Sequence, residues 1–100
     1  MKAGSNLEKV LEKKLFAVSG ELGPPKGNDI SVIERKADLL KGYVDAVNVT
    51  DNQTAIVRMS SISTSSFLLQ MGLEPVMQMT TRDRNRIAIQ SDVFGATALG

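Results

Sequence analysis

The sequence has no cysteine, no histidine and no tryptophan, and its 100 residues include only one tyrosine and three phenylalanines. The lack of cysteine excludes a disulfide framework and a thiolate metal site. The lack of histidine removes the commonest zinc ligand and the commonest general base. We therefore expect no metal site, and any acid–base chemistry would have to use carboxylates.

An excess of either charge is also missing. The chain has 12 basic and 11 acidic residues and a net charge of +1, too small a field to attract nucleic acid or an anionic membrane. No hydrophobic run approaches the roughly 18 to 20 residues of a membrane span, and the N-terminus has no apolar signal core. These absences predict a soluble, cytoplasmic protein that binds neither nucleic acid nor a membrane.

Three short stretches rich in aliphatic and β-branched residues have the composition of β-strands. They are Leu15–Glu21, Tyr43–Val49 and Leu73–Met79. The second is almost entirely apolar apart from Asp45 and Asn48, which is typical of a parallel strand covered on both faces. Polar residues stand at the end of each stretch, so we expect the functional side chains at the carboxyl ends of the strands.

Helical patterns separate these strands, because apolar residues recur there at three- and four-residue intervals after residues that can cap a helix. The predicted helices run from a Ser5–Glu8 capping box to about Lys14, from Asn28 or Asp29 through Ile30–Lys41, from Ser60 or Ser61 to about Met71, and from Asp83 as N-cap to Leu99. We expect the first helix to cover one end of the sheet. Gly42 and Gly72 should end the second and third helices, and Gly95 should interrupt the last. Residues 53–58 are predicted to form a loop with one helical turn.

A strand that ends in polar groups and is followed by a helix is the repeating unit of open α/β sheets and (β/α)8 barrels. Three parallel strands alone would leave both sheet edges bare, and a closed barrel needs about 200 residues or more. We therefore predict an α/β fold in which residues 1–100 form one partial domain, the N-terminal portion of a (β/α)8 TIM barrel with about three β/α units. A compact three-stranded α/β domain and a barrel completed by self-association are the alternatives.

Three motifs stand at the ends of the predicted strands: Gly20-Glu21-Leu22-Gly23-Pro24-Pro25, Val47-Asn48-Val49-Thr50-Asp51-Asn52, and the run from Pro75 to Asn85. In order and spacing they resemble the opening of the methylenetetrahydrofolate reductase family. The branch found in acetogenic and related bacteria is the most similar. The resemblance covers nearly the whole chain but only about the first third of the family's catalytic domain, a flavin-containing (β/α)8 barrel.

The family reduces the methylene bridge of 5,10-methylenetetrahydrofolate to a methyl group with hydride from a reduced flavin. The resemblance implies that Glu21 is the general acid that helps to open the five-membered ring of the folate. In the family's usual Glu-Phe-Phe-Pro-Pro motif two aromatic residues follow the acid, where this chain has Leu22 and Gly23. A carboxylic acid performs this task near neutral pH when its surroundings raise its pKa, as a water-excluding barrel mouth can.

The resemblance also implies that Thr50 lies beside the flavin and pterin rings and that Gln78 and Thr80 contact the flavin. Gln78 and Thr81 stand where the better-known branch has His and Cys. The residues agree in part with these roles, because hydroxyl and amide groups suit the hydrogen-bonding edge of a flavin or a pterin. The predicted site is Glu21 for catalysis, Thr50, Gln78 and Thr80 for a flavin (FAD, or FMN), and Glu21, Thr50 and Asn52 for the folate.

Structural interpretations of the same residues remain open. Glu21 would equally suit a strand-end carboxylate paired with Lys26, and Thr50–Asn52 would suit a cap on the following turn. The run Arg82–Arg86 would suit a solvated helix start. Because three arginines in a first turn oppose the helix dipole, the run also favours pairing with carboxylates across the barrel or a subunit contact.

Two other classes of function fit the pattern: the pterin-binding barrel of a corrinoid-linked methyltransferase, which uses no flavin, and a non-catalytic α/β association module. The resemblance implies a tetrahydrofolate substrate, NAD(P)H or another electron-carrying partner, a homo-oligomer, and a place in one-carbon metabolism and methionine biosynthesis. In the family, further flavin-binding groups come from later strands. We therefore predict that residues 1–100 alone do not catalyse the reaction.

Overall fold

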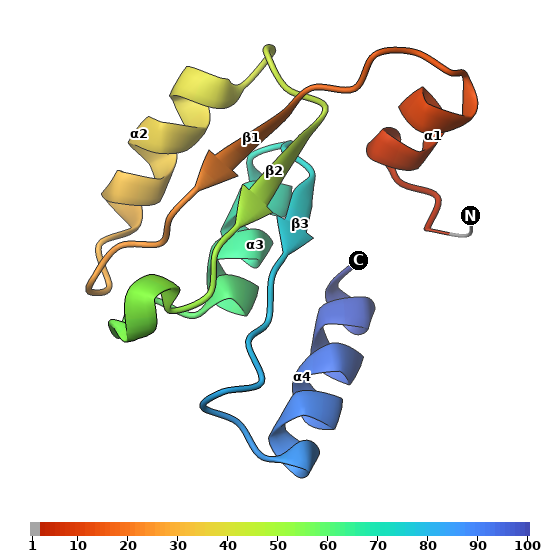
Figure 1. The fold of residues 1–100 in the computed structure, drawn as a ribbon. Helices are drawn as coiled ribbons and strands as arrows, with labels where there is room; N and C mark the ends of the chain where they lie inside the picture. Colours follow the sequence, from red (N-terminus) through yellow and green to blue (C-terminus); the bar gives the residue numbers. More distant parts are fainter. Residues whose placement is uncertain (1–2) are drawn as a thin grey trace.

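In the computed structural model, which describes residues 3–100, three parallel strands form one sheet in the order β1-β2-β3 (Figure 1). The strands are β1 (Ser19–Leu22), β2 (Ala46–Val49) and β3 (Pro75–Met77). Glu21 lies opposite Asn48 in the register of the sheet, and Asn48 lies opposite Val76. The predicted α/β class with a parallel sheet is confirmed.

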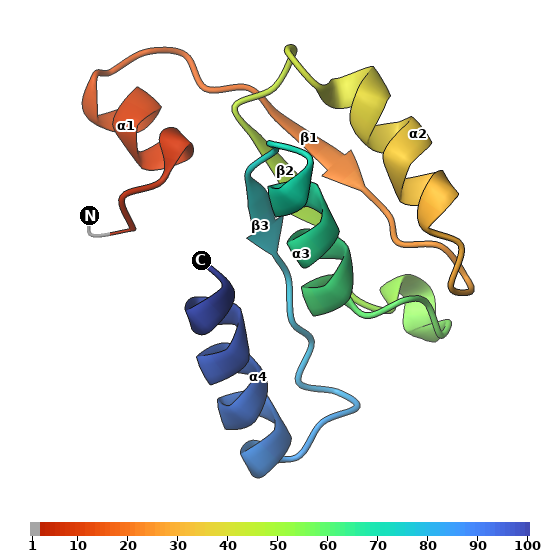
Figure 2. The same cartoon turned by 180° about the vertical axis from the view of Figure 1, so that it is seen from behind.

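Within residues 3–100 the connecting elements are helical: α1 (Asn6–Glu12), α2 (Ile30–Leu40), the short 3₁₀-helix η1 (Gln53–Ala55), α3 (Ser61–Gln70) and α4 (Arg86–Leu99). Helix α2 packs on β1, α3 packs on β2 and β3, and the two helices contact each other. Seen from behind, both helices lie over the same face of the sheet (Figure 2). The predicted loop with a helical turn at residues 53–58 is confirmed by η1.

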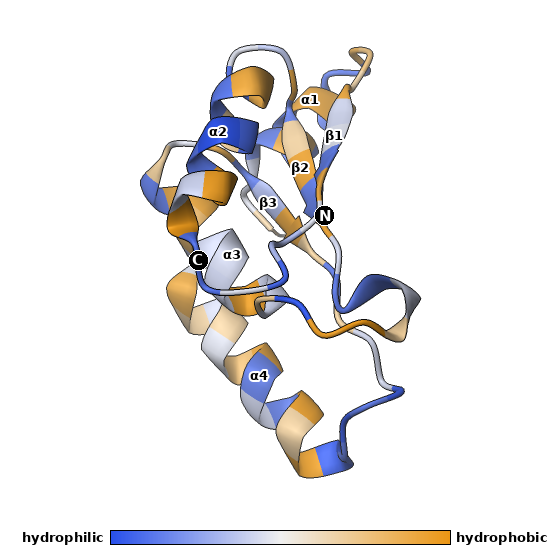
Figure 3. Ribbon diagram, turned by 90° about the vertical axis from the view of Figure 1, so that its left-hand side faces the viewer, coloured by the Kyte–Doolittle hydropathy of each residue, from blue (hydrophilic) through white to orange (hydrophobic). Residues whose placement is uncertain are grey.

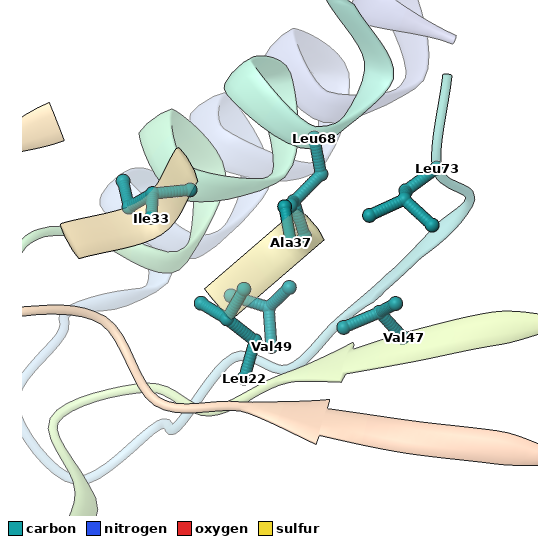
Figure 4. Packing of buried hydrophobic residues seen from close by; sticks show 7 residues of the cluster. All are labelled: Leu22, Ile33, Ala37, Val47, Val49, Leu68 and Leu73. Carbon is teal, nitrogen blue, oxygen red and sulfur yellow. The ribbon is translucent and has the colours of Figure 1, made fainter. Parts of the chain in front are cut away.

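The hydrophobic core lies between the sheet and these two helices (Figure 4). Side chains alternate between the two faces of a strand, which directs Leu22, Val47 and Val49 toward the helices. The buried core cluster consists of these three residues with Ile33 and Ala37 of α2, Leu68 of α3, and Leu73 before β3. The opposite face of the sheet therefore carries Glu21 and Asn48.

Helix α3 is rich in serine and threonine, which are poor helix formers. It buries Ser61, Thr64, Ser65 and Leu68. The hydroxyl of Ser61 also donates to the carbonyl oxygen of Gln78 over 2.7 Å. Packing against the sheet thus stabilises this helix despite its weak propensity.

Each α-helix begins at a side chain that accepts a hydrogen bond from an amide of the first turn. The acceptors are Ser5, Asp29, Ser60 and Asn85. Gly42 and Gly72 follow α2 and α3 with φ angles of 85° and 80°, a left-handed conformation that glycine adopts without strain. The predicted ends of these two helices are therefore confirmed.

Helix α1 lies at the amino ends of β2 and β3 (Figure 1). The carboxylate of Glu74, which precedes β3, accepts hydrogen bonds from the amides of Asn6 and Leu7, the second over 2.8 Å. The side-chain amide of Asn6 donates to the carbonyl oxygen of Asp45, just before β2, over 3.1 Å. The first helix thus covers one end of the sheet, as predicted, and that end is the one opposite the strand exits.

The strands are shorter than the sequence predicts. Residues 15–18 lie outside β1, and Phe16 is 91% exposed, because β2 starts only at Ala46 and offers them no continuous ladder. Tyr43 belongs to the turn after α2, where its amide donates to the carbonyl oxygen of Leu40 over 3.0 Å. The predicted third strand is likewise trimmed at both ends, to residues 75–77.

Two helix boundaries and one predicted break are also wrong. Helix α1 ends at Glu12, because Lys14 adopts a left-handed φ of 55°. Helix α4 begins at Arg86 with Asn85 as its N-cap, since the side chain of Asp83 pairs instead with Arg82. Helix α4 also runs through Gly95 without interruption.

Among residues 3–100, α4 is less buried than the other α-helices, each of which has at least one buried residue. It contacts α3, yet it has no buried residue, and Ile87 and Phe94 are 77% and 75% exposed. Figure 3 shows hydrophobic positions along α4 interspersed with hydrophilic ones. Large hydrophobic side chains that are this exposed on one helix are typical of an element that packs against further structure.

Candidate active site

The predicted site residues gather at the carboxyl edge of the sheet and on the face without helices. Glu21 of β1 and Asn48 of β2 are opposite each other there, and Val76 of β3 continues the row. The amide of Gln78 donates to the carbonyl oxygen of Val49 over 3.0 Å and so extends the pairing of β2 with β3 by one residue. The parallel topology thus brings three separate sequence motifs to one edge.

Glu21 is exposed, and among residues 3–100 no hydrogen bond or ion pair joins its carboxylate to another side chain or to an amide. The predicted alternative of a pair with Lys26 is therefore wrong. The loop after Glu21 is held firmly: the carbonyl oxygens of residues 23, 24 and 25 accept hydrogen bonds from Lys36 Nζ (2.9 Å), Arg58 Nη1 (3.2 Å) and the amide of Met59 (2.8 Å). A free carboxylate thus stands beside a fixed backbone.

Thr50, the residue directly after β2, is 6% exposed. Its Oγ1 atom is buried and has no hydrogen-bond partner within residues 3–100. A Cβ atom at Gly23 would lie 3.8 Å from this oxygen, an ordinary contact distance, so the glycine is a close neighbour of the hydroxyl. An unpaired buried hydroxyl costs free energy, which makes Thr50 a candidate for contact with a polar group of a ligand.

Asp51 is buried, with a fully covered side chain. Its Oδ2 atom accepts hydrogen bonds from the amide and the hydroxyl of Thr80 (2.8 and 3.2 Å) and from Arg84 Nη1 (2.5 Å). Burial alone would raise the pKa of Asp51, but the hydrogen bonds from Arg84 and Thr80 outweigh it and hold the pKa below the usual value. Asp51 is therefore an ionised carboxylate whose hydrogen bonds link the exits of β2 and β3.

Asn52 has a left-handed backbone with φ of 44°, a conformation that asparagine tolerates. Its Oδ1 atom accepts a hydrogen bond from the amide of Arg58 over 2.9 Å, and its carbonyl oxygen accepts one from Arg82 Nη2 over 3.3 Å. No side chain caps η1, so the predicted cap from Thr50–Asn52 is wrong. The side chain of Asn52 shapes the loop.

Gln78 and Thr80 differ in how their side chains are engaged. Gln78 is exposed, and its side-chain amide makes no hydrogen bond within the described part of the chain. The hydroxyl of Thr80 donates to Asp51, and its carbonyl oxygen accepts from Arg84 Nη1 over 2.6 Å. Gln78 thus keeps both its donor and its acceptor for a ligand, whereas Thr80 is largely committed to the loop.

Asn48 is a site residue that the predicted set omits. Its half-buried side chain lies beside Glu21, and its Nδ2 atom donates to the carbonyl oxygen of Gly20 over 3.4 Å. The signal was present in the sequence, because Asn48 is the only polar residue within Ala46–Val49. Its significance depends on which face of the strand it occupies, and the register decides that.

The arginine run proves to be a set of ion pairs. Arg84 pairs with the buried Asp51 and, through Nε, with Asp92 over 3.4 Å, and Arg82 pairs with its neighbour Asp83. Arg84 thus pairs with a carboxylate at the exit of the neighbouring strand, whereas pairing across a barrel and a subunit contact stay predictions. Asp51 raises the pKa of Arg84 above its usual value, so both partners stay charged.

The model of the methylenetetrahydrofolate reductase family matches residues 6–100, nearly the whole chain and all three of these strand exits. The chain belongs to the methylenetetrahydrofolate reductase family. The searches of curated proteins and of solved structures gave no match. Membership implies a methylenetetrahydrofolate reductase-like function, that of an oxidoreductase acting on a folate.

The candidate site at the carboxyl ends of the strands is separate from a cavity at their amino ends. That cavity has a volume of about 730 Å³ and lies where α1 meets the amino ends of the strands, with Asn6, Asp45 and Glu74 among its lining residues. No predicted site residue lines it. Within residues 3–100 none of the helices combines the length and hydrophobicity of a membrane span.

Proposed function

We propose that this chain supplies the acid and part of the cofactor and substrate pocket of a flavin-dependent methylenetetrahydrofolate reductase of the acetogen-like branch. The observation that carries the proposal is the unpartnered buried hydroxyl of Thr50, which lies next to Gly23 at the end of the sheet that also holds Glu21 and Gln78. A free acid, a free amide and an orphaned hydroxyl on one face suit a planar heterocycle with polar edges.

Glu21 acts as the general acid in this proposal. Its carboxylic acid protonates the ring nitrogen whose bond to the methylene carbon breaks, and the five-membered ring opens to an iminium. A flavin, FAD or FMN, held beside Thr50 and Gln78 would supply the hydride for that carbon. Glu21 would regain its proton from solvent once the product has left.

The other site residues bind and orient. Thr50 Oγ1 and the Gln78 amide donate to or accept from the polar edges of the flavin, and Thr50 also meets the pterin. Thr80 would support the flavin pocket indirectly, through its hydrogen bond to Asp51. Asn52 would support the folate pocket by shaping the loop that follows β2. The predicted roles of Thr80 and Asn52 are thus proposed to be less direct than that of Thr50.

We propose that these three β/α units are the N-terminal portion of a (β/α)8 barrel. Two features support this: the helix-free sheet face carries the polar site, and α4 exposes Ile87 and Phe94. Barrel enzymes place their sites at the carboxyl ends of the strands. Further strands would enclose the acid and exclude water from it, so residues 1–100 alone are proposed to be inactive. An electron donor such as NAD(P)H, a homo-oligomeric state and a cytoplasmic location complete the proposal.

The test is a visible absorbance spectrum of the purified chain before and after incubation with free flavin and removal of the excess. Retained flavin absorbance that is lost in Thr50→Val but kept in Thr97→Val would support the pocket, because Thr97 is an exposed threonine of α4. A colourless chain would mean that flavin binding requires further strands, and the test would move to a longer protein that contains them. A longer protein that binds a pterin without flavin would favour the corrinoid-linked methyltransferase.

A further inference from the structure

Thr50 and Gln78 directly follow β2 and β3, and the side chain of Asp51 links the chain beyond these two strand exits. Asp51 directly follows Thr50, and its carboxylate bonds the amide of Thr80, two residues beyond Gln78. Arg84 closes the arrangement, because its Nη1 atom donates both to Asp51 Oδ2 and to the carbonyl oxygen of Thr80. The exits of β2 and β3 are therefore joined by a buried charge and not by continued strand pairing.

The strand pairing itself ends too early to perform this task. Pairing of β2 with β3 stops at Val49 and Met77, and one further hydrogen bond reaches the amide of Gln78. Beyond it the chain leaves the sheet on both sides. Beyond that point the hydrogen bonds of Asp51 with Thr80 and Arg84 join the two exits. Ser61 bonds the carbonyl oxygen of Gln78, and Arg82 bonds the carbonyl oxygen of Asn52.

We propose that Asp51 is a positioning residue, which acts through Thr80 and Arg84 to hold Gln78 and Thr50 at the spacing one ligand requires. The inference rests on the proposed function only for the identity of that ligand. The buried carboxylate is bonded on both oxygens, and a fully bonded buried ion pair fixes geometry more reliably than it adds stability. The loop is thus fixed before any ligand arrives.

The experiment uses ¹⁵N-labelled protein and follows the amide signals of Thr50 and Thr80 and the side-chain amide of Gln78. Asp51→Ala removes the carboxylate that links the two exits, and Arg84→Met removes the cation that pairs with it. Arg84→Lys keeps the positive charge and should restore much of the wild-type spectrum. Asp38→Ala and Arg86→Met are matched controls, because both residues are exposed and make no ion pair within residues 3–100. Hydrogen exchange of the β2 amides reports on the fold.

The expected result is that Asp51→Ala shifts the signals of Thr50, Gln78 and Thr80 while exchange in β2 stays close to wild type. In a titration with FMN, the concentration that gives half of the shift should rise about tenfold, as expected when one of two hydrogen-bonding groups is misplaced. Arg84→Lys should lie near wild type in both measurements.

Two results would overturn the proposal. Thr50 and Gln78 signals at wild-type positions in Asp51→Ala would show that other contacts hold the exits. Equal loss of exchange protection across β2 and at Thr80 would show that Asp51 stabilises the whole fold instead. If FMN moves no signal of the wild-type chain, flavin binding has to be tested on a longer protein with more strands, while the ligand-free spectra decide the role of Asp51.

Discussion

Glu21 lies directly opposite Asn48 in the parallel sheet, on the face that no helix covers. The side-chain amide of Asn48 is turned toward β1, where it donates to the carbonyl oxygen of Gly20. The acid therefore has a polar, half-buried neighbour on one side and the fixed loop of residues 23–25 after it. This setting defines what a substitution of Glu21 should change.

Glu21→Gln should leave the fold intact, because the side chain is exposed and makes no bond within residues 3–100. In an enzyme that carries this segment, the rate of folate reduction should fall about 10²- to 10⁴-fold, the usual contribution of a general acid. Steady-state kinetics of the variant measure this. Glu34→Gln, an exposed carboxylate on α2, is the matched control and should keep the wild-type rate. Equal rates for the two variants would remove Glu21 from the mechanism.

Leu68→Ala should destabilise the chain by about 2 to 5 kcal/mol, because Leu68 is fully buried between α3 and the sheet and its loss leaves a cavity. Leu39→Ala makes the same chemical change on α2 at a side chain that is 78% exposed, and it should cost within about 0.5 kcal/mol. Urea unfolding monitored by circular dichroism compares the two. Similar midpoints would contradict the observed core.

Acid should remove the stabilisation that Asp51 provides. The pKa of Asp51 is lower in the folded state than its ordinary value of 3.8, so its contribution is present above that value and is lost as the pH falls through the folded pKa. Asp51→Asn lacks this titration. The difference in unfolding free energy between the two proteins should be constant near neutral pH and shrink below about pH 4.

Asp29 also has a lowered pKa, because the side chain and the amide of Ser31 donate hydrogen bonds to it. It is present in both proteins of the comparison and cancels from the difference. Urea midpoints measured over a pH series give the curve. A difference that grows toward acid pH would show that Asp51 is not ionised in the folded state.

Glu74→Ala should release α1 from the sheet, since the carboxylate of Glu74 accepts hydrogen bonds from the amides of Asn6 and Leu7 at the start of that helix. Hydrogen exchange of the α1 amides should accelerate toward that of an isolated peptide, because a seven-residue helix is not stable alone. Exchange in β2 should remain slow. Glu34→Ala serves as the control for loss of an exposed carboxylate, and unchanged α1 protection in Glu74→Ala would contradict the assigned contact.

Much of the fold could be predicted from the sequence, because local rules decide it. Caps at Ser5, Asp29 and Ser60 and the glycines after α2 and α3 depend on residues within one turn, and all were found as predicted. Strand ends failed, because the length of a strand depends on its neighbour. Phe16 has the composition of a strand residue, yet it has no partner in the sheet.

The site was predicted only where a motif carried it. The roles of Glu21, Thr50 and Gln78 were implied by the resemblance to the family, and the sheet brings these three strand ends together. The hydrogen bond between Asp51 and Thr80 joins residues 29 positions apart, and the ion pair of Asp51 with Arg84 joins residues 33 positions apart. No local sequence pattern could specify either contact. Asn48 was missed because its face became known only with the register.

The two hydrogen bonds between Glu74 and the start of α1 join residues that are separated by 68 and 67 positions in the sequence. Loop closure over such a distance comes late, after the local helices and the contacts of neighbouring strands have formed. On a ribosome, which releases the amino end first, α1 would emerge long before the carboxylate that caps it. Helix α1 is thus synthesised before β3 but becomes ordered only after it, so a docked α1 shows that β3 is in place.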